Sequence, residues 1–207
     1  GIPVSKPAYI VNQVCGSGLR SIVSGFQSIK LEENKIIVSG GQENMSRAPH
    51  SLFYRENKKL DESKLIDTMI NDGLTDSFNH YHMGVTAENV AEKFEISRDE
   101  QDNFALSSQK KAQDASDKKK FEDEIIKLQI NKEKENFIFD KDEHPRRDLI
   151  IDDLKKLKTV FKENGTVTPG NSSGINDGAA ATVLMTRKQA ELKSIEPLVK
   201  VVSWASC

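Results

Sequence analysis

The feature that most restricts the fold is a run of apolar residues, spaced three and four apart, between two short β-branched segments. The run is Leu19, Ile22, Val23, Phe26 and Ile29. Its spacing predicts a helix with one apolar face that ends near Asn34. Val11 to Val14 precedes this helix, Ile36 to Val38 follows it, and each is predicted to be a strand. This order predicts a βαβ unit with a parallel sheet that is buried on both faces.

The middle of the chain, from Met45 to Asn171, differs from the segments on either side. Charged residues are dense there and apolar runs are short, which indicates a solvated insertion. Ser97 and Glu100 match a capping box, so a helix is expected to begin at Arg98. Further on, apolar residues alternate with polar ones, which predicts two strands joined through the polar residues 131–136. The alternating residues are Ile126, Leu128 and Ile130, followed by Phe137 and Phe139.

Core-like composition returns near the end of the chain. The segment 177–185 is rich in Ala and Val, 187–193 is predicted to be a short helix, and 198–204 is predicted to be a buried strand. The first residue is not Met, and the last residues stop in or just after an apolar run. Both ends are therefore expected to be cut from a longer chain.

Composition excludes several functional classes. With 30 Lys and Arg against 32 Asp and Glu, the net charge of −2 provides no general attraction for nucleic acid or an anionic membrane. Apolar runs are far shorter than the roughly 20 residues of a membrane-spanning helix. Two cysteines, Cys15 and Cys207, cannot form a disulfide framework or a four-ligand zinc site. We therefore expect a soluble enzyme without a metal, in a reducing, cytoplasmic setting.

Cys15 is the sharpest candidate for a nucleophile. It follows an expected strand and precedes an expected helix, whose free N–H groups and positive dipole end favour a thiolate. Gly16 and Gly18 leave room for a substrate, and nearby N–H groups are suited to bind a developing oxyanion. The alternative is that Cys15 is a small buried apolar residue, which is common for a lone cysteine.

Two further segments suit ligand binding. Tyr81, His82 and Met83 combine an aromatic ring, an imidazole and a thioether, which fits an apolar slot for a long, amide-bearing ligand. The alternative is the packed start of a helix. The Gly-, Ser- and Asn-rich segment 165–178 is too long for a tight turn, so it is expected to be a shaped, functional loop.

Taken together, four segments resemble the thiolase family, and more narrowly its bacterial acetyl-CoA acetyltransferase branch. They are VNQVCGSGLR at 11–20, GGQENMS at 40–46, YHMGVTAENV at 81–90, and the loop at 165–178. The resemblance covers essentially the whole chain but only the middle of a thiolase. It implies an α/β enzyme with the layered αβαβα fold, made of two similar halves with a loop domain inserted into the first.

On this template the chain contains four parts. Residues 1–44 belong to the N-terminal core, 45–175 form the CoA-binding loop domain, 176–196 add the closing strand and helix of the core, and 197–207 begin the C-terminal half. The resemblance also implies a homo-oligomer, either a dimer or a tetramer. CoA thioesters are the implied substrates, and no cofactor is expected.

The resemblance further implies a reaction and its nucleophile. Cys15 is expected to attack acetyl-CoA, form an acetyl-enzyme and release CoA. A second acetyl-CoA then loses a methyl proton, and its carbanion takes the acetyl group to give acetoacetyl-CoA. The reverse reaction is thiolysis. The His82-Met83 pair is more typical of enzymes for short substrates than of those for long 3-ketoacyl chains, and His82 is not expected to be the base.

Six residues are implied to contact CoA. Four correspond to positions that line the pantetheine tunnel, namely Leu74, His82, Met83 and Phe161. Ser173 corresponds to a hydrogen-bonding position at the pantetheine amides, and Arg146 to an arginine beside the adenine, where a planar cation can stack. Pro169 stands where thiolases usually have a small residue; it lacks an N–H and stiffens the loop.

The family's remaining catalytic motifs lie in its C-terminal half, and the 207 residues contain none of them. These motifs are a cysteine in CxG, a histidine in GHP and an asparagine in NEAF; Cys207 lacks the glycines that would follow. The 207 residues alone are therefore not expected to condense acetyl-CoA. Two alternatives stay open: a non-catalytic fragment or decayed homologue that retains CoA or partner binding, and a longer-chain 3-ketoacyl-CoA thiolase. A ketoacyl synthase shares the nucleophile corner but typically uses paired histidines and acyl-carrier protein. The Tyr81–Met83 cluster and the large inserted loop domain favour a thiolase instead.

Overall fold

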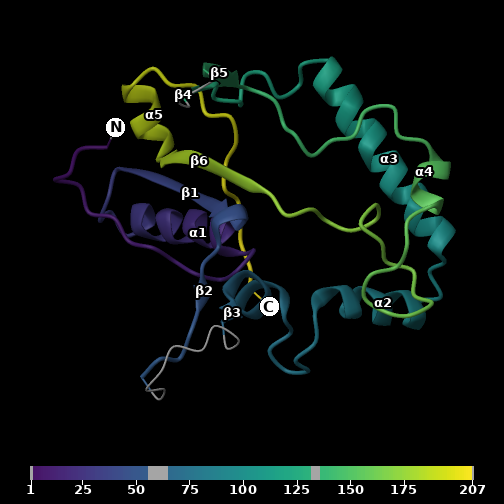
Figure 1. Cartoon of the computed structure of the whole chain (residues 1–207). Coiled ribbons are helices and arrows are strands. Elements are labelled where there is room, and N and C mark those ends of the chain that lie inside the picture. Colours follow the sequence, from purple (N-terminus) through teal and green to yellow (C-terminus); the bar gives the residue numbers. More distant parts are fainter. Residues whose placement is uncertain (1, 56–64, 132–135, 207) are drawn as a thin grey trace. The chain divides into compact units, whose positions relative to one another are not determined.

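The chain divides into two compact units. The computed structural model describes residues 2–55, 65–131 and 136–206 (Figure 1). Unit 1 comprises Gly1–Ala48 and Asn176–Cys207, and unit 2 comprises Pro49–Ile175. Unit 2 is thus one continuous insertion into unit 1. The finer division into four parts, with their assignment to core and loop domains, stays a prediction.

Unit 1 is built on a helix and two antiparallel strands. Its elements are α1 (Ser17–Lys30), β1 (Ile36–Asn44), the 3-10 turn η1 (Met45–Arg47), β6 (Asp177–Met185) and α5 (Arg187–Leu192). β1 pairs with β6 along its whole length, and α1 packs against both strands (Figure 1). Gly25 of α1 permits this close packing, because an added Cβ would press against the side chains of Ser39 and Leu184.

The predicted helix with an apolar face is confirmed, although it ends earlier than expected. Its last residue is Lys30 rather than one near Asn34. The cause is local: the N–H of Leu31 donates to the Gln27 carbonyl, the N–H of Glu32 donates to the Ile29 carbonyl, and Glu32 has φ 62°. A left-handed residue just after the last turn is a common way to end a helix. The strand predicted at 36–38 is also confirmed, within the longer β1.

The predicted βαβ unit is wrong in two respects. Val11 to Val14 is irregular backbone that leads into a turn, because the Asn12 side chain accepts the Val14 N–H at 3.0 Å and Val14 takes φ 47°. Such local bonds compete with strand formation. β1 pairs instead with the antiparallel β6 from the far end of the chain. Most residues of β1 are exposed, so burial on both faces is wrong as well.

The buried strand predicted at 198–204 is also wrong. This segment is irregular, and the side chains of Leu198, Val199 and Val202 are 98%, 85% and 80% exposed. Pro197 has no N–H to offer a ladder at its start. Within the part of the chain that the structure describes, β1 and β6 form a two-stranded sheet with no third strand.

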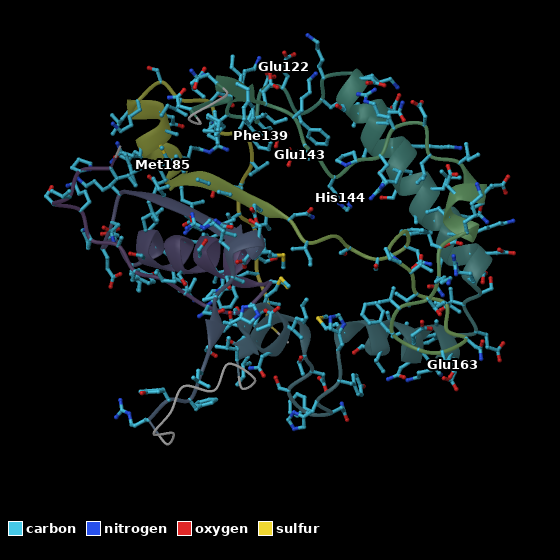
Figure 2. All side chains as sticks on the ribbon, in the orientation of Figure 1. Glu122, Phe139, Glu143, His144, Glu163 and Met185 are labelled. Atoms are coloured by element: carbon cyan, nitrogen blue, oxygen red, sulfur yellow. The ribbon has the colours of Figure 1, made fainter. Side chains whose placement is uncertain are left out.

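Unit 2 consists of helices and short strand pairs. Its helices are α2 (Met83–Lys93), α3 (Arg98–Asp117), α4 (Ile151–Lys155) and the single π-helical turn η3 (Met69–Leu74). Its strands are β2 (His50–Ser51), β3 (Ile66–Asp67), β4 (Leu128–Asn131) and β5 (Asn136–Phe139). α3 packs against α4, and the buried apolar side chains among the described residues of the unit are Ala91, Leu106, Leu154 and Val167. Most charged side chains of α3 are exposed. Figure 2 draws the described side chains as sticks, and those of α3 project from the helix on several sides.

Two local predictions in unit 2 are confirmed. Ser97 and Glu100 form the capping box in front of α3, each side chain accepting the backbone N–H of the other. The alternating segments form the antiparallel pair β4 and β5, with Leu128 opposite Phe139. Ile126 lies before the first strand. Residues 132–135 of the predicted connection lie outside the described residues.

Candidate active site

Cys15 lies on a tight turn at the start of α1. It is exposed and directly precedes Gly16, the residue before the first helical turn. The Ser17 side chain ties the turn together: its Oγ accepts the Gln13 N–H at 2.8 Å and its hydroxyl donates to the Val14 carbonyl at 2.6 Å. The structure therefore presents the Cys15 thiol on the surface of unit 1 rather than within a core.

The turn is also strained at the residue before the cysteine. Val14 has φ 47°, in the left-handed region that a β-branched side chain rarely adopts. Such a conformation costs about 1–3 kcal/mol and persists only where the surroundings enforce it. A strained turn that leads into a helix is also how α/β-hydrolases present an exposed nucleophile. The geometry of the Cys15 turn is thus suited to nucleophilic attack.

His82 and Phe161 form the centre of a second group of predicted residues, in unit 2. His82 is the N-cap of α2, and its Nδ1 accepts the Gly84 N–H at 2.9 Å, so the neutral ring carries its proton on Nε2. The rings of His82 and Phe161 stack with centroids 4.7 Å apart and planes 18° apart. Gly84 is necessary here, because an added Cβ would overlap the Phe161 ring.

A shallow apolar cavity of about 330 Å³, largely open to solvent, extends from Met83 along α2. Its walls are Met83, Thr86, Ala87, Val90, Ala91, Ile96 and Gln101. This volume lies at the lower end of the range for small-molecule pockets, and an apolar wall with few polar groups is typical of them. Met83, which is half-exposed, joins this cavity to the helix end that carries His82.

The part of the predicted loop that lies in unit 2, residues 165–175, is called the Gly165 loop below. Its first residues are bound by Glu88, which is 4% exposed. The carboxylate accepts the N–H and hydroxyl of Thr166 at 2.9 Å and the N–H of Val167 at 2.8 Å. Burial raises the pKa of Glu88, but these hydrogen bonds outweigh it and hold the pKa below its ordinary value. Glu88 is therefore a buried, charged anchor.

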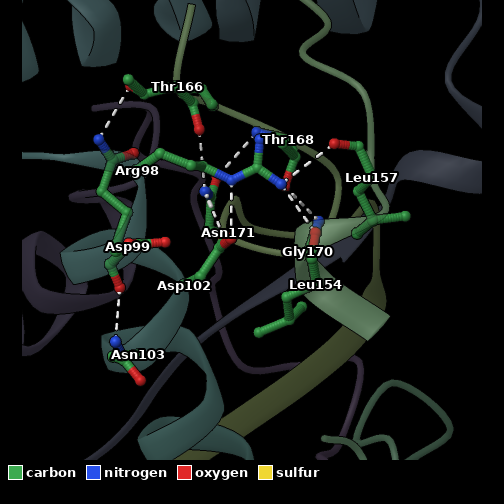
Figure 3. A network of polar contacts seen from close by, with 12 residues as sticks. Arg98, Asp99, Asp102, Asn103, Leu154, Leu157, Thr166, Thr168, Gly170 and Asn171 are labelled. Atoms are coloured by element: carbon green, nitrogen blue, oxygen red, sulfur yellow. Dashed lines mark hydrogen bonds and ion pairs between the residues drawn. The ribbon is translucent and has the colours of Figure 1, made fainter. Parts of the chain in front are cut away.

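The middle of the Gly165 loop is held by a second buried carboxylate (Figure 3). Asp102 of α3 is fully buried and accepts from Arg98 Nε at 2.7 Å and from Asn171 Nδ2 at 3.0 Å. Asn171 in turn donates to the Thr166 carbonyl and accepts the Thr168 N–H. Arg98 also donates to the carbonyls of residues 154 and 157, just before and after the end of α4. Bonds from α2 and α3 thus define the shape of the loop.

The remaining predicted residues lie around these features. Leu74 ends η3 and is half-buried, and the next residue, Thr75, forms a β-bridge with His82. This bridge places the end of η3 beside His82. Arg146 is exposed, and its backbone N–H donates to Gln109 of α3 at 2.9 Å. Ser173 and Pro169 are exposed on the Gly165 loop, outside the His82–Phe161 stack.

Sequence reasoning missed the two buried carboxylates. Glu88 stands four residues after Gly84 and three before Ala91, which are the other buried residues of α2. A charged residue in a buried helical register is a usable signal, because a buried charge needs partners. The sequence carries no comparable sign that the partners are loop amides far along the chain. No group of three or more His, Cys, Asp or Glu side chains that could hold a metal ion occurs within residues 2–55, 65–131 and 136–206.

The family of the chain follows from comparison with known proteins. Residues 1–188 match the family model described as thiolase, N-terminal domain. The chain belongs to the thiolase family. Sequence relatives include the acetyl-CoA acetyltransferase of Rhizobium meliloti strain 1021, 49% identical over 206 residues, with 100% of this chain and 52% of the relative covered. The cytosolic acetyl-CoA acetyltransferase of Rattus norvegicus is 45% identical, and the match covers 99% of this chain and 52% of that relative.

Solved thiolase structures have the same fold. The acetyl-CoA acetyltransferase from Syntrophomonas wolfei superposes with a TM-score of 0.89 at 39% identity, covering 96% of this chain and 50% of that one. Human mitochondrial 3-ketoacyl-CoA thiolase superposes with a TM-score of 0.88 at 38% identity, and the match again covers 96% of this chain and 50% of that one. The predicted family and the predicted partial thiolase-like α/β fold are therefore confirmed. The chain spans about half the length of the relatives it matches.

Proposed function

We propose that a protein carrying this chain catalyses reversible acyl transfer between CoA thioesters through an acyl group on Cys15. The favoured reaction is the condensation of two acetyl-CoA molecules to acetoacetyl-CoA and CoA. The observation that carries this proposal is the exposed thiol of Cys15 on a strained turn at the start of a helix, in a chain of the thiolase family. Relatives named acetyl-CoA acetyltransferase support the choice of reaction.

The proposed reaction has two steps at Cys15. The sulfur attacks the thioester carbonyl of acetyl-CoA, the bond between that carbonyl and the CoA sulfur breaks, and CoA leaves as the thiol after gaining a proton. A second acetyl-CoA then loses a methyl proton, and its carbanion attacks the acetyl group so that the Cys15 thiolate leaves. The 207 residues hold the nucleophile but lack the GHP, CxG and NEAF motifs. We assign the proton transfers to groups outside them.

Unit 2 is proposed to bind the CoA part of the substrate. The stacked His82 and Phe161, with Leu74 and Met83, are proposed to contact pantetheine, and Ser173 its amides. The stack and the cavity beside Met83 support this assignment, because both provide apolar surface for a long, thin ligand. The exposed Arg146 is proposed to stack on the adenine. No cofactor besides the CoA substrate enters the proposal.

The location and assembly of the protein belong to the same proposal. We propose a cytoplasmic homo-oligomer, a dimer or a tetramer. A reactive exposed thiol persists best where thiols stay reduced, and the rat relative is named cytosolic. Among the described residues, no helix is both long and apolar enough to cross a membrane.

Steady-state kinetics of a purified protein carrying this chain test the proposal. Rates are measured for acetyl-CoA condensation and for thiolysis of acetoacetyl-CoA and of a long 3-ketoacyl-CoA. Cys15→Ala is expected to lower all three rates by about a thousandfold or more. The matched control Cys207→Ala should keep the parent rates. A Cys15→Ala protein with parental activity contradicts the proposal, and CoA binding without turnover by the parent supports a non-catalytic role. Faster thiolysis of the long substrate favours the 3-ketoacyl-CoA thiolase alternative.

A further inference from the structure

The buried carboxylate of Glu88 takes no part in the proposed acyl-transfer steps, and its partners indicate another role. Four hydrogen bonds reach it from two consecutive residues, Thr166 and Val167. Val167 is itself buried, so the bonds attach the beginning of the Gly165 loop to the middle of α2. Gly165 fits this close approach, because an added Cβ there would overlap the Glu88 carboxylate.

The same helix carries the other group of predicted CoA contacts. His82 and Met83 stand at the N-terminus of α2, and Phe161 covers that end by stacking on His82. Glu88 lies on the buried side of α2 with Gly84, which faces the Phe161 ring. One rigid helix therefore supports both the His82–Phe161 stack and the start of the loop that carries Ser173.

We propose that Glu88 is a positioning residue that fixes the Gly165 loop to α2 and so sets the spacing between the loop-borne and helix-borne CoA contacts. This inference rests on the proposed CoA-binding function of unit 2. Glu88 acts through Thr166 and Val167 and needs no contact with the substrate. It is expected to govern CoA affinity, while the reactivity of Cys15 depends on the local turn in unit 1.

The carboxylate form of residue 88 is essential to this role. An ionised carboxylate offers only acceptors, which matches the two N–H groups and one hydroxyl that converge on it. Glutamine has nearly the same size but directs an NH₂ group into this set of donors. Glu88→Gln therefore removes acceptors without creating a cavity, and it separates the charge from the volume of the side chain.

Three measurements on the 207-residue chain test the inference. CoA affinity is measured by calorimetry under reducing conditions, protection of the Thr166 and Val167 amides by hydrogen exchange, and Cys15 reactivity by the rate of alkylation with iodoacetamide. Glu88→Gln is expected to raise the Kd for CoA and to speed exchange of both amides, each by about tenfold or more. The alkylation rate should stay at the parent value, because Cys15 lies on a local turn of unit 1 that Glu88 does not contact. Far-UV circular dichroism of each variant checks that the chain is folded.

Glu92→Gln is the matched control. Glu92 lies one turn further along α2, has a 72% exposed side chain and pairs with Lys162 at 2.9 Å. Because exposed ion pairs contribute little, this variant should change the Kd for CoA and the exchange rates less than about twofold.

Two milder variants keep the test informative if Glu88→Gln does not fold. Thr166→Val removes one donor to Glu88 and should weaken CoA binding in the same direction, and Glu88→Asp should retain more affinity than Glu88→Gln.

The outcomes separate this inference from the proposed function. If the parent chain binds CoA and Glu88→Gln behaves like Glu92→Gln in both affinity and exchange, Glu88 is not a positioning residue, and the proposed function stands. If the parent chain does not bind CoA, the proposed CoA-binding role of unit 2 fails. In that case the hydrogen-exchange data alone test whether Glu88 fixes the Gly165 loop to α2. If Glu88→Gln leaves the protection of the Thr166 and Val167 amides unchanged, Glu88 does not fix the loop.

Discussion

The Cys15 turn and the Gly165 loop are stabilised in opposite ways. The side-chain hydrogen bonds of the turn join residues at most four positions apart, and one residue in it is strained. The Gly165 loop is bound by Glu88 and Asp102, which are 78 and 69 positions away from their partners in the loop. A reactive group can thus be presented by local backbone geometry, whereas a loop that shapes a ligand site needs buried charges from distant helices.

The largest test of this contrast removes the second buried anchor. Asp102→Ala leaves Arg98 and Asn171 without their shared acceptor and is expected to lower the free energy of unfolding by about 3 kcal/mol. Asp114→Ala on the same helix is the control. Its side chain is 55% exposed and pairs with Lys118, so the loss should stay below about 1 kcal/mol. Urea unfolding followed by circular dichroism measures both, and equal losses would break the contrast.

A smaller effect is expected from packing on α2. Gly84→Ala forces the Phe161 ring away from the helix and disrupts its stack with His82, at an expected cost of about 2 kcal/mol. Gly73→Ala is the control, because among the described residues nothing lies within 4 Å of an added Cβ there. Thermal unfolding compares the two variants. If Gly84→Ala and Gly73→Ala unfold at the same temperature, the stack contributes nothing to the stability of unit 2.

The smallest effect, and one of opposite sign, is expected at the Cys15 turn. Val14→Gly removes the strain of a β-branched residue at φ 47° and should stabilise the chain by about 1 kcal/mol or less, because glycine's backbone entropy offsets part of the gain. Val11→Gly, outside the left-handed region, relieves no strain and should destabilise. Urea midpoints of the two variants give the comparison. If Val14→Gly destabilises as much as Val11→Gly, the turn is not strained.

The same contrast explains what the sequence could predict. Three correct predictions depend only on residues that are close in sequence: the apolar face of α1, the capping box at Ser97, and the alternation in β4 and β5. Each was predicted and is observed. His82 and Phe161 were assigned to the pantetheine tunnel from the resemblance alone, and the structure stacks their two rings; their contact with CoA stays a prediction.

The errors concern long-range partners. β1 pairs with β6 from the other end of the chain, so reasoning from neighbouring segments gave the wrong strand partner and the wrong direction. At Val11 to Val14, bonds from Asn12 and Ser17 outweigh β-branched propensity. The role of Glu88 and Asp102 was not predicted because their partners in the Gly165 loop are backbone N–H groups, a threonine hydroxyl and an asparagine, which carry no distinctive sequence pattern.

The central claim, that Cys15 carries the acyl group, is tested most directly by trapping that group. A protein carrying this chain is mixed with acetyl-CoA, stopped in acid and digested, and the peptides are mapped by mass spectrometry. The account predicts one acetyl group on the peptide that contains Cys15, and its absence from the same peptide of Cys15→Ala. An acetyl group found elsewhere, with Cys15 unmodified while acetoacetyl-CoA accumulates, would contradict the account.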